Sequence, residues 1–292
     1  MNYSIKSNYY LAIHCQPIFH LQGTNRRSSN QYFFYPIILI IFASITILSL
    51  PVLFNYKSKV DLIEKNFYKN FKIYLKSSDN ISYKPFPKPH LLVENAKLNL
   101  SKSKKKNSLI ETSNLKIYIS LRDVYLRSFK NLISTEISDT NLNMTFNDLN
   151  NIRKHLYEKV NKPIFFNNCK IFIRNKKNEV ILISPVKKIF YKINNKSKMK
   201  SFVVNGKIFG LNYKSEWKRN YDTPKISIHN VNIFNPNIEL KNKLKFIDKE
   251  KFNIHSNIEY AQDKMEYNIK YKDGIINIYS PNKNKTNFNI KS

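Results

Sequence analysis

The sequence is poor in the residues that build disulfide frameworks, metal centres and phosphate-binding loops. Among 292 residues there are only 2 cysteines and 4 glycines. Cys15 and Cys169 allow at most one disulfide, and a thiol-based metal site needs more ligands than these two. Neither a G-x-G-x-x-G pattern nor a P-loop is present, which argues against nucleotide binding through a glycine-rich loop.

Acidic residues and histidines are also few, and no arrangement of them suggests catalysis. The chain has 20 Asp and Glu and 6 His, and no two histidines are at metal-ligand spacing. No serine lies in a nucleophile-elbow context. His155 is expected on the exposed surface of a helix. We therefore expect a protein that is not an enzyme and has no catalytic residues, no metal site and no cofactor.

Because negative charge is scarce, the formal net charge is +30. Such a charge is typical of proteins whose partners are anionic, either nucleic acid or lipid headgroups. About 40 residues are asparagine, and Lys, Asn, Ile and Tyr share A/T-rich codons, so the base composition of the genome explains part of the bias. Nucleic-acid binding would need basic and aromatic residues interleaved on a soluble module, and the apolar run described next argues against it.

The longest apolar run is YFFYPIILIIFASITILSLPVLF, from Tyr32 to Phe54, and no charged residue lies between Arg27 and Lys57. As a helix this run extends about 34 Å, enough to cross the hydrocarbon core of a bilayer. A cleaved signal peptide is the alternative, but its apolar region is shorter and ends at small residues, and no A-x-A pattern follows here. We predict an uncleaved transmembrane helix over 32–54.

An amphipathic helix is predicted over 55–71, where the chain leaves the membrane. Val60, Ile63, Phe67 and Phe71 recur at helical spacing, and they face either the membrane or a sheet. Basic residues close to a bilayer attract anionic headgroups with about 1 kcal/mol each. The alternative for such lysines is a solvated face. The candidate headgroup contacts are Lys57, Lys59, Lys65, Lys69 and Lys72.

Strand-like alternation follows from about residue 72. In YKPFPKPHLLVENAKLNL, from Tyr83 to Leu100, three prolines at alternate positions are expected to hold the chain extended before a two-faced strand. Apolar residues on one face of this strand and the next ones are candidates for lining a lipid groove, with an ordinary sealed core as the alternative. These candidates are Ala96, Leu98, Leu100, Leu115, Ile117, Ile119, Leu142, Met144 and Phe146.

About fifteen strands joined mostly by short polar turns predict an antiparallel meander. One convincing helix, 148–160, interrupts them. Because one or two short helices cannot cover so long a sheet, its apolar face must close, fold on itself or line a cavity. The predicted fold is mainly β, with an N-terminal transmembrane helix and a long twisted antiparallel sheet curled into a groove.

Residues 32–147 resemble the AsmA family of bacterial envelope proteins. The likeness begins with the membrane helix, the helix SKVDLIEKNFYKNF and the short strand FKIYL. The segment SYKPFPKPHLLVENAKLNL stands where the family has a W-P-x-L-x-L-x-x-V-x-L run, with Tyr83 or Phe86 in place of Trp. The segment IETSNLKIYISLRDVYLRSFKNLISTEISDTNLNMTFN then resembles a strand, turn and strand of the family, although most family glycines are Asn or Lys here.

The resemblance implies a single-pass protein of the bacterial inner membrane. Basic residues flank the apolar run on both sides, so charge alone gives no orientation; the resemblance places the N-terminus in the cytoplasm and the bulk of the chain in the periplasm. The implied organisation is a disordered cytoplasmic tail over 1–31, the transmembrane helix over 32–54, the exit helix over 55–71 and an AsmA-like β-groove domain over 72–292.

The AsmA family is associated with outer-membrane biogenesis, and its long members resemble bridge-like lipid-transfer proteins. The implied function is to bind lipid acyl chains in an apolar β-groove and to support outer-membrane biogenesis or phospholipid transport. The implied partners are membrane lipids and other envelope proteins, with no nucleic acid. The alternative is a non-catalytic scaffold or assembly factor for envelope proteins, which would have a filled core and a stable protein partner.

Overall fold

The computed structural model describes residues 31–77, 80–100, 110–175, 177–223, 225–247, 251–272, 275–280 and 288–291. The chain divides into two units, Met1–Ile45 and Thr46–Ser292. The tail predicted over 1–31 lies outside the described residues except for its last residue, and so does Cys15. Cys169 is a buried free thiol.

Helix α1 (Gln31–Ser49) makes up the described part of the first unit and continues into the second, where the 3₁₀ turn η1 (Leu50–Leu53) follows it. In the part of the chain that the structure describes, Phe34–Leu53 is the one helical stretch long and apolar enough to cross a membrane. Its 20 residues reach about 30 Å. Its large apolar side chains are exposed, as the lipid-facing surface of a spanning helix would be. This agrees with the predicted segment 32–54.

The second unit is mainly β. The turn η2 (Lys57–Lys59) and α2 (Val60–Phe71) precede the first strands, and α3 (Leu121–Tyr125) and α4 (Phe146–Lys159) lie between later ones. The strands are β1 (Tyr74–Lys76), β2 (Ile81–Lys84), β3 (His90–Asn99), β4 (Ile110–Ile119), β5 (Leu132–Ser138), β6 (Asn141–Thr145), β7 (Ile164–Arg174), β8 (Val180–Asn194), β9 (Met199–Ile208), β10 (Leu211–Asn220), β11 (Ile226–Phe234), β12 (Ile238–Phe246), β13 (Lys251–Tyr260), β14 (Asp263–Lys272), β15 (Ile275–Tyr279) and β16 (Phe288–Lys291).

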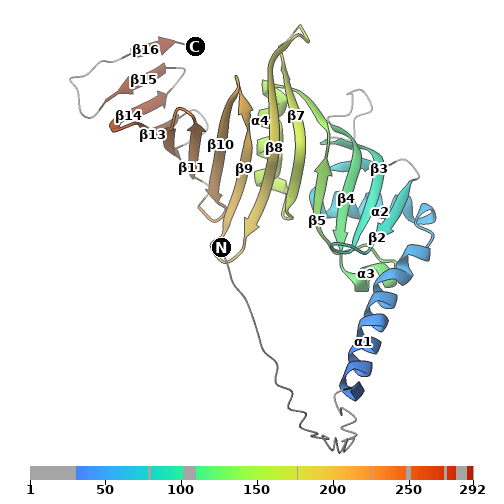
Figure 1. Cartoon of the computed structure of the whole chain (residues 1–292). Coiled ribbons are helices and arrows are strands. Elements are labelled where there is room, and N and C mark those ends of the chain that lie inside the picture. The colour runs from blue at the N-terminus through green and yellow to red at the C-terminus, as the bar shows by residue number, and fades with distance from the viewer. Residues whose placement is uncertain are drawn as a thin grey trace, which may run out of the picture. The chain divides into compact units, whose positions relative to one another are not determined.

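All sixteen described strands belong to one sheet (Figure 1). From β7 to β16 each strand pairs with the next one along the chain and runs antiparallel to it, which confirms the predicted meander. Two parallel pairings depart from that prediction, because β7 pairs with both β5 and β6. Helix α4 connects β6 to β7, and a helical crossover of this kind returns the chain to the same end of the sheet.

Helix α4 begins earlier than the predicted 148–160 because of a capping box. The Thr145 side chain accepts a hydrogen bond from the Asp148 backbone, and the Asp148 carboxylate accepts one from the Thr145 backbone, which satisfies two otherwise unpaired helix-end donors. We had expected Phe146 on the groove face of a strand together with Leu142 and Met144, but it is the first residue of α4. The structure does not describe the Phe146 side chain.

Helix α2 packs on the sheet. Ile63, Phe67 and Phe71 are fully buried in the main core, and Val60 packs against it. The expected helix over 55–71 begins only at Val60, after the η2 turn. The apolar side of this helix therefore faces the sheet and not the membrane, which were the two possibilities left by the sequence.

The proline-rich segment is a bent loop and not the extended segment that we expected. Strands β2 and β3 form an antiparallel pair with Lys84 opposite His90, and the chain bends at residues 86–88 between them. Because proline has no N–H to contribute to a ladder, Pro85, Pro87 and Pro89 are compatible with the hairpin end but not with its strands.

Burial of apolar side chains changes along the sheet. The main core joins α2 to the inner faces of β3 through β8. On this inner face Tyr191 of β8 is the last buried apolar side chain in the described sequence, and Val203 of β9 is buried on the other face. Strands β12, β13 and β14 still alternate apolar and polar residues, and β10 and β11 keep Trp217 and Val231 on the cavity side. The sheet therefore has a closed first part, covered by α2 and partly by α4, and an open second part.

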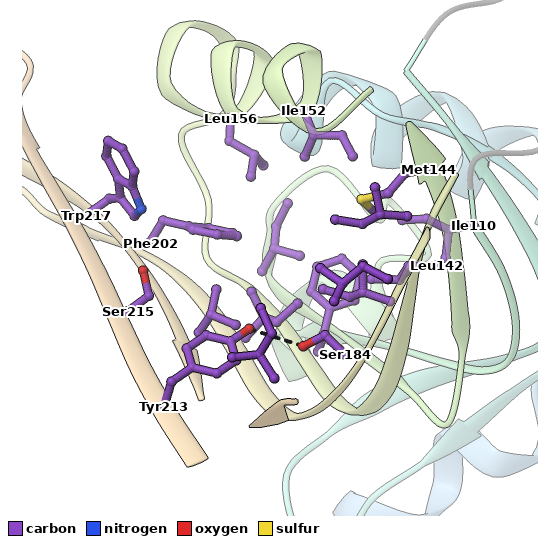
Figure 2. Close-up of a pocket in the computed structure, with 18 of the residues that line it drawn as sticks. Ile110, Leu142, Met144, Ile152, Leu156, Ser184, Phe202, Tyr213, Ser215 and Trp217 are labelled. Atoms are coloured by element: carbon purple, nitrogen blue, oxygen red, sulfur yellow. Dashed lines mark hydrogen bonds between the residues drawn. The ribbon is translucent and has the colours of Figure 1, made fainter. Parts of the chain in front are cut away.

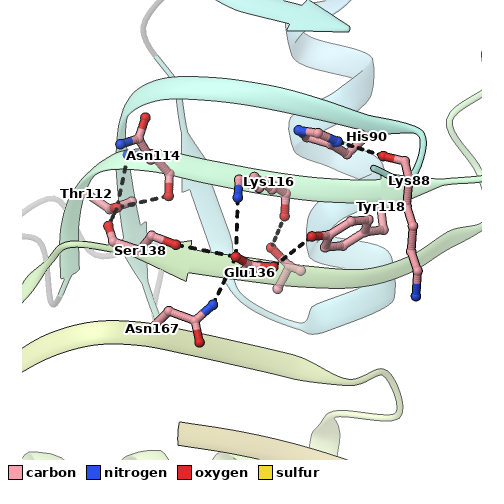
Figure 3. A network of polar contacts seen from close by, with 10 residues as sticks. Lys88, His90, Thr112, Asn114, Lys116, Tyr118, Glu136, Ser138 and Asn167 are labelled. Atoms are coloured by element: carbon pink, nitrogen blue, oxygen red, sulfur yellow. Dashed lines mark hydrogen bonds and ion pairs between the residues drawn. The ribbon is translucent and has the colours of Figure 1, made fainter. Parts of the chain in front are cut away.

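A polar network joins the strands at the parallel junction, on the face away from the core (Figure 3). Glu136 on β5 accepts hydrogen bonds from Tyr118 at 2.7 Å and from Asn167 on β7 at 2.9 Å, and it pairs with Lys116 at 3.3 Å. Burial would raise the pKa of Glu136, but these hydrogen bonds and the Lys116 charge outweigh it and hold the pKa below its ordinary range.

This network predicts acid sensitivity of the fold. Since the folded pKa of Glu136 is lowered, its stabilising contribution is present above the ordinary glutamate pKa of about 4.3 and is lost as the pH falls through the folded value. We expect the free energy of unfolding, measured by urea denaturation in detergent, to fall below about pH 5, and the variant Glu136→Gln to lose part of this pH dependence. The matched control is Glu158→Gln, at an exposed glutamate of α4. An unchanged pH profile in Glu136→Gln would contradict the prediction.

Candidate functional site

An apolar cavity of about 630 Å³ lies on the inner face of the second unit (Figure 2). This volume is within the range of small-molecule sites. Ile152 and Leu156 of α4 form one side of it. The opposite sides come from β3, β4 and β6 through β11, including Leu142, Phe202 and Trp217.

The C-terminal end of α4 is fastened to the strands beneath it. Lys200 is buried, and its Nζ donates hydrogen bonds to the carbonyl oxygens of Tyr157 at 2.7 Å and Val160 at 3.1 Å. The Tyr191 hydroxyl lies 2.8 Å from the Leu156 carbonyl oxygen. Burial lowers the pKa of Lys200, and the last carbonyls of a helix favour a positive charge there. Residues of β8 and β9 therefore hold α4 over the cavity.

Four polar side chains of the cavity wall, Ser184, Tyr213, Ser215 and His229, form hydrogen bonds within the protein. Ser184 Oγ donates to the Lys207 carbonyl at 2.9 Å, so the Tyr213 hydroxyl, 3.3 Å away, is the donor to Ser184. Ser215 Oγ lies 2.9 Å from His229 Nε2, and the His229 ring stacks on Trp217 with centroids 3.7 Å apart. The wall thus offers a ligand mainly apolar contacts.

The apolar wall continues beyond the cavity along the open part of the sheet. In the observed register Val231 lies opposite Leu240, which lies opposite Ile258, which lies opposite Met265. A second row runs through Leu244, Ile254, Ile269 and Ile278. Side chains directly opposite in register point to the same face of a sheet. One apolar face therefore runs from the cavity to β15, and all of these side chains are at least partly exposed.

A row of polar side chains crosses this face between the two apolar rows. His229, Asn242, Ser256 and Tyr267 lie opposite one another in successive strands, and Ser256 Oγ donates to Asn242 Oδ1 at 2.6 Å. The inward side chains of β12 are Ile, Leu, Asn, Leu and Phe, and those of β13 are Phe, Ile, Ser, Ile and Tyr. A slip of two residues would keep the same face inward but would set polar against apolar side chains. The polar row therefore favours the observed register.

The opposite face of β12, β13 and β14 is polar and mostly basic. Ion pairs lie along it, such as Lys241 with Glu239 at 3.0 Å and Lys264 with Glu266 at 3.2 Å. These pairs are exposed, so each contributes little to stability. Their position shows that the two faces differ in polarity over β12 to β14, whereas the outer face of β11 also exposes Ile226, Ile228 and Phe234.

The groove candidates named from the sequence divide between the closed core and the cavity. Leu98, Leu100, Leu142 and Met144 line the cavity. Ala96, Leu115, Ile117 and Ile119 are buried in the main core and are not among the lining residues. The strands of the open half were recognised in the sequence, but no candidate was named on them. The alternation of apolar and polar residues in segments such as NIELKNKLKF and KFNIHSNIEY could have identified the apolar residues of these strands as groove candidates.

The headgroup candidates lie on η2 and α2. Lys57, Lys65 and Lys69 are exposed, whereas Lys59 and Lys72 are half-buried, and Lys72 Nζ lies 5.8 Å from the Tyr68 ring centroid. His155, expected on the helix surface, is half-buried. Its Nε2 donates to the Lys72 carbonyl at 2.7 Å, and burial lowers its pKa. Among the described residues no group of three or more His, Cys, Asp or Glu is placed to hold a metal ion.

The sequence matches no protein-family model and no curated protein. Function therefore has to be inferred from the cavity, the open apolar face and the apolar helix.

The fastening of α4 gives a direct prediction. Lys200→Met should leave the carbonyls of Tyr157 and Val160 without a donor, and we expect a loss of about 1–3 kcal/mol in the free energy of unfolding. Urea denaturation measured by circular dichroism checks this. Lys207→Met, at an exposed position of the same strand, is the control and should stay within about 0.5 kcal/mol of the unsubstituted protein. Equal effects of the two substitutions would mean that Lys200 does not hold the helix.

Proposed function

We propose that this chain is an AsmA-like, membrane-anchored envelope protein that shelters lipid acyl chains against the apolar face of its sheet. In this proposal the anchor lies in the bacterial inner membrane and the sheet lies in the periplasm. The role is support of outer-membrane biogenesis or phospholipid transport, without catalysis and without a cofactor.

The observation that carries the proposal is the change in burial along the sheet. On the inward face no described apolar side chain beyond Tyr191 of β8 is buried, yet two inward rows of apolar side chains continue through β11 to β15. Exposed apolar surface is disfavoured by about 25 cal/mol per Å², and contiguous patches of this kind mark interaction sites. An acyl chain lying along the rows would cover this surface without needing hydrogen-bond partners.

Two further features support a lipid over a protein ligand. The cavity is continuous with the open rows through Val231, which lines it and lies opposite Leu240. The wall side chains Ser184, Tyr213, Ser215 and His229 already form hydrogen bonds within the protein, so they do not favour a polar ligand. The competing function is that of a scaffold for other envelope proteins. A scaffold would bind an envelope protein stably through its basic outer face.

The single tryptophan, Trp217, is a built-in reporter for this proposal because it lines the cavity. The full-length protein in detergent would be incubated with phospholipid carrying brominated acyl chains and then separated from unbound lipid. We expect the retained lipid to quench Trp217 fluorescence, because bromine quenches only at close range.

The matched control is the double variant Trp217→Phe, Lys218→Trp. Residue 218 is the next residue of β10 and points to the opposite face, so the two tryptophan positions differ in the face of the sheet that they occupy. Quenching at 217 but not at 218 supports an acyl chain on the apolar face. Equal quenching at the two positions, or none at 217, would contradict the proposed lipid site.

A further inference from the structure

Three segments far apart in the sequence gather at one end of the sheet, within the second unit. They are residues 46–56 with η1, the β2–β3 loop over 85–89, and residues 120–131 with α3. The Tyr56 ring stacks on Tyr83 of β2 with centroids 6.5 Å apart, and the Ile119 backbone donates to the Pro89 carbonyl at 3.3 Å. The Tyr125 ring contacts Phe54 with centroids 5.9 Å apart. These contacts make one continuous surface, which we name the η1–α3 end.

Each of the three segments exposes a large apolar side chain at this end. Leu53 is 85% exposed, Phe86 59% and Leu126 65%. Val52 and Tyr125 beside them are also exposed. Single exposed apolar residues are common on soluble proteins, but their collection on one surface marks an interaction site.

The exposure is not caused by a loosely held loop. Asp123 is buried beneath α3, where its carboxylate accepts hydrogen bonds from Ser120 and Ser128 at 2.7 Å each. Phe129, two residues after Arg127, is fully buried. The Arg127 guanidinium lies 4.6 Å from the Phe54 ring centroid. The segment that carries Leu126 is therefore fixed at both ends, with this side chain directed outward.

The charge of the η1–α3 end is of one sign. Lys84, Lys88, Arg122 and Arg127 are exposed around the apolar tips. Asp123 is the single acidic residue in residues 46–59, 84–89 and 120–131, all of which the structure describes, and it is buried. Apolar tips surrounded by basic residues are typical of surfaces that lie in the interface of an anionic membrane.

We propose that the η1–α3 end is a second membrane contact beside the end of the spanning segment at Leu53, which places Phe86 and Leu126 in the interfacial region of an anionic bilayer. The occupant is assigned from two observations. Leu53 is the last residue of the apolar stretch that is long enough to span a membrane, so this surface is continuous with the point where the chain leaves the bilayer. Its charge is complementary to anionic headgroups. The contact does not depend on what the groove carries.

The experiment uses the full chain in nanodiscs that contain phosphatidylglycerol, with brominated or ordinary acyl chains. In a Trp217→Phe background, Phe86→Trp and Leu126→Trp each place one tryptophan at the η1–α3 end. Phe209→Trp is the control, because Phe209 is 84% exposed on the β9–β10 turn, outside the proposed surface. Since interfacial side chains reach about 5–10 Å into the headgroup and acyl boundary, we expect roughly twofold or greater quenching at 86 and 126 and none at 209.

A second measurement needs no substitution. Hydrogen exchange at 121–127 should be slower, by about fivefold, in nanodiscs with anionic lipid than in nanodiscs with zwitterionic lipid, since each basic residue near the surface contributes about 1 kcal/mol. Quenching at 86 or 126 no greater than at 209, or exchange that is the same with both lipids, would overturn the proposal. Because Trp217 is absent from the quenching variants, failure here is distinct from failure of the lipid groove.

Discussion

The structure depends on one constraint: each strand has an apolar side, and the described helices cover only part of the resulting face. Alternation puts every second side chain on the same side of a strand, and sixteen strands in one sheet align these sides. Helix α2 supplies Ile63, Phe67 and Phe71 to close the first part. Helix α4 covers the middle incompletely and leaves a cavity. Beyond it, the same alternation continues without a covering layer.

Much of this architecture could be predicted because it depends on the local spacing of apolar residues. The strand class, the meander from β7 onward, the apolar helix and the burial of Ala96, Leu115, Ile117 and Ile119 all follow from period-two or helical spacing. Period alone could not divide these residues between a sealed core and an open site. That division depends on where α2 and α4 pack, and their apolar sides do not specify which strands they cover.

Other features depend on contacts between distant segments and carry no local signal. The parallel junction requires β7 to pair with both β5 and β6. The Glu136 network joins β5 to Tyr118 and Lys116 of β4 and to Asn167 of β7. The start of α4 is an exception, because Thr145 and Asp148 at capping-box spacing were a local signal that went unused. The approach of the β2–β3 loop to the start of the α3 segment, where the Ile119 backbone donates to the Pro89 carbonyl, likewise follows from the register of β3 and β4, which the sequence does not fix.

The nearest-neighbour pairing of β8 to β16 also bears on how the length of such a protein can change. Each of β8 to β15 pairs with its two neighbours along the chain and β16 pairs with β15, so this half of the sheet is nearly one-dimensional, as in solenoids. Insertion or loss of one hairpin would alter its reach by about 10 Å, since adjacent strands are about 4.8 Å apart. The closed core would be untouched, because no buried apolar residue lies beyond β9 in the described chain. Evolution can therefore adjust the reach of this sheet in hairpin steps while stability is maintained elsewhere.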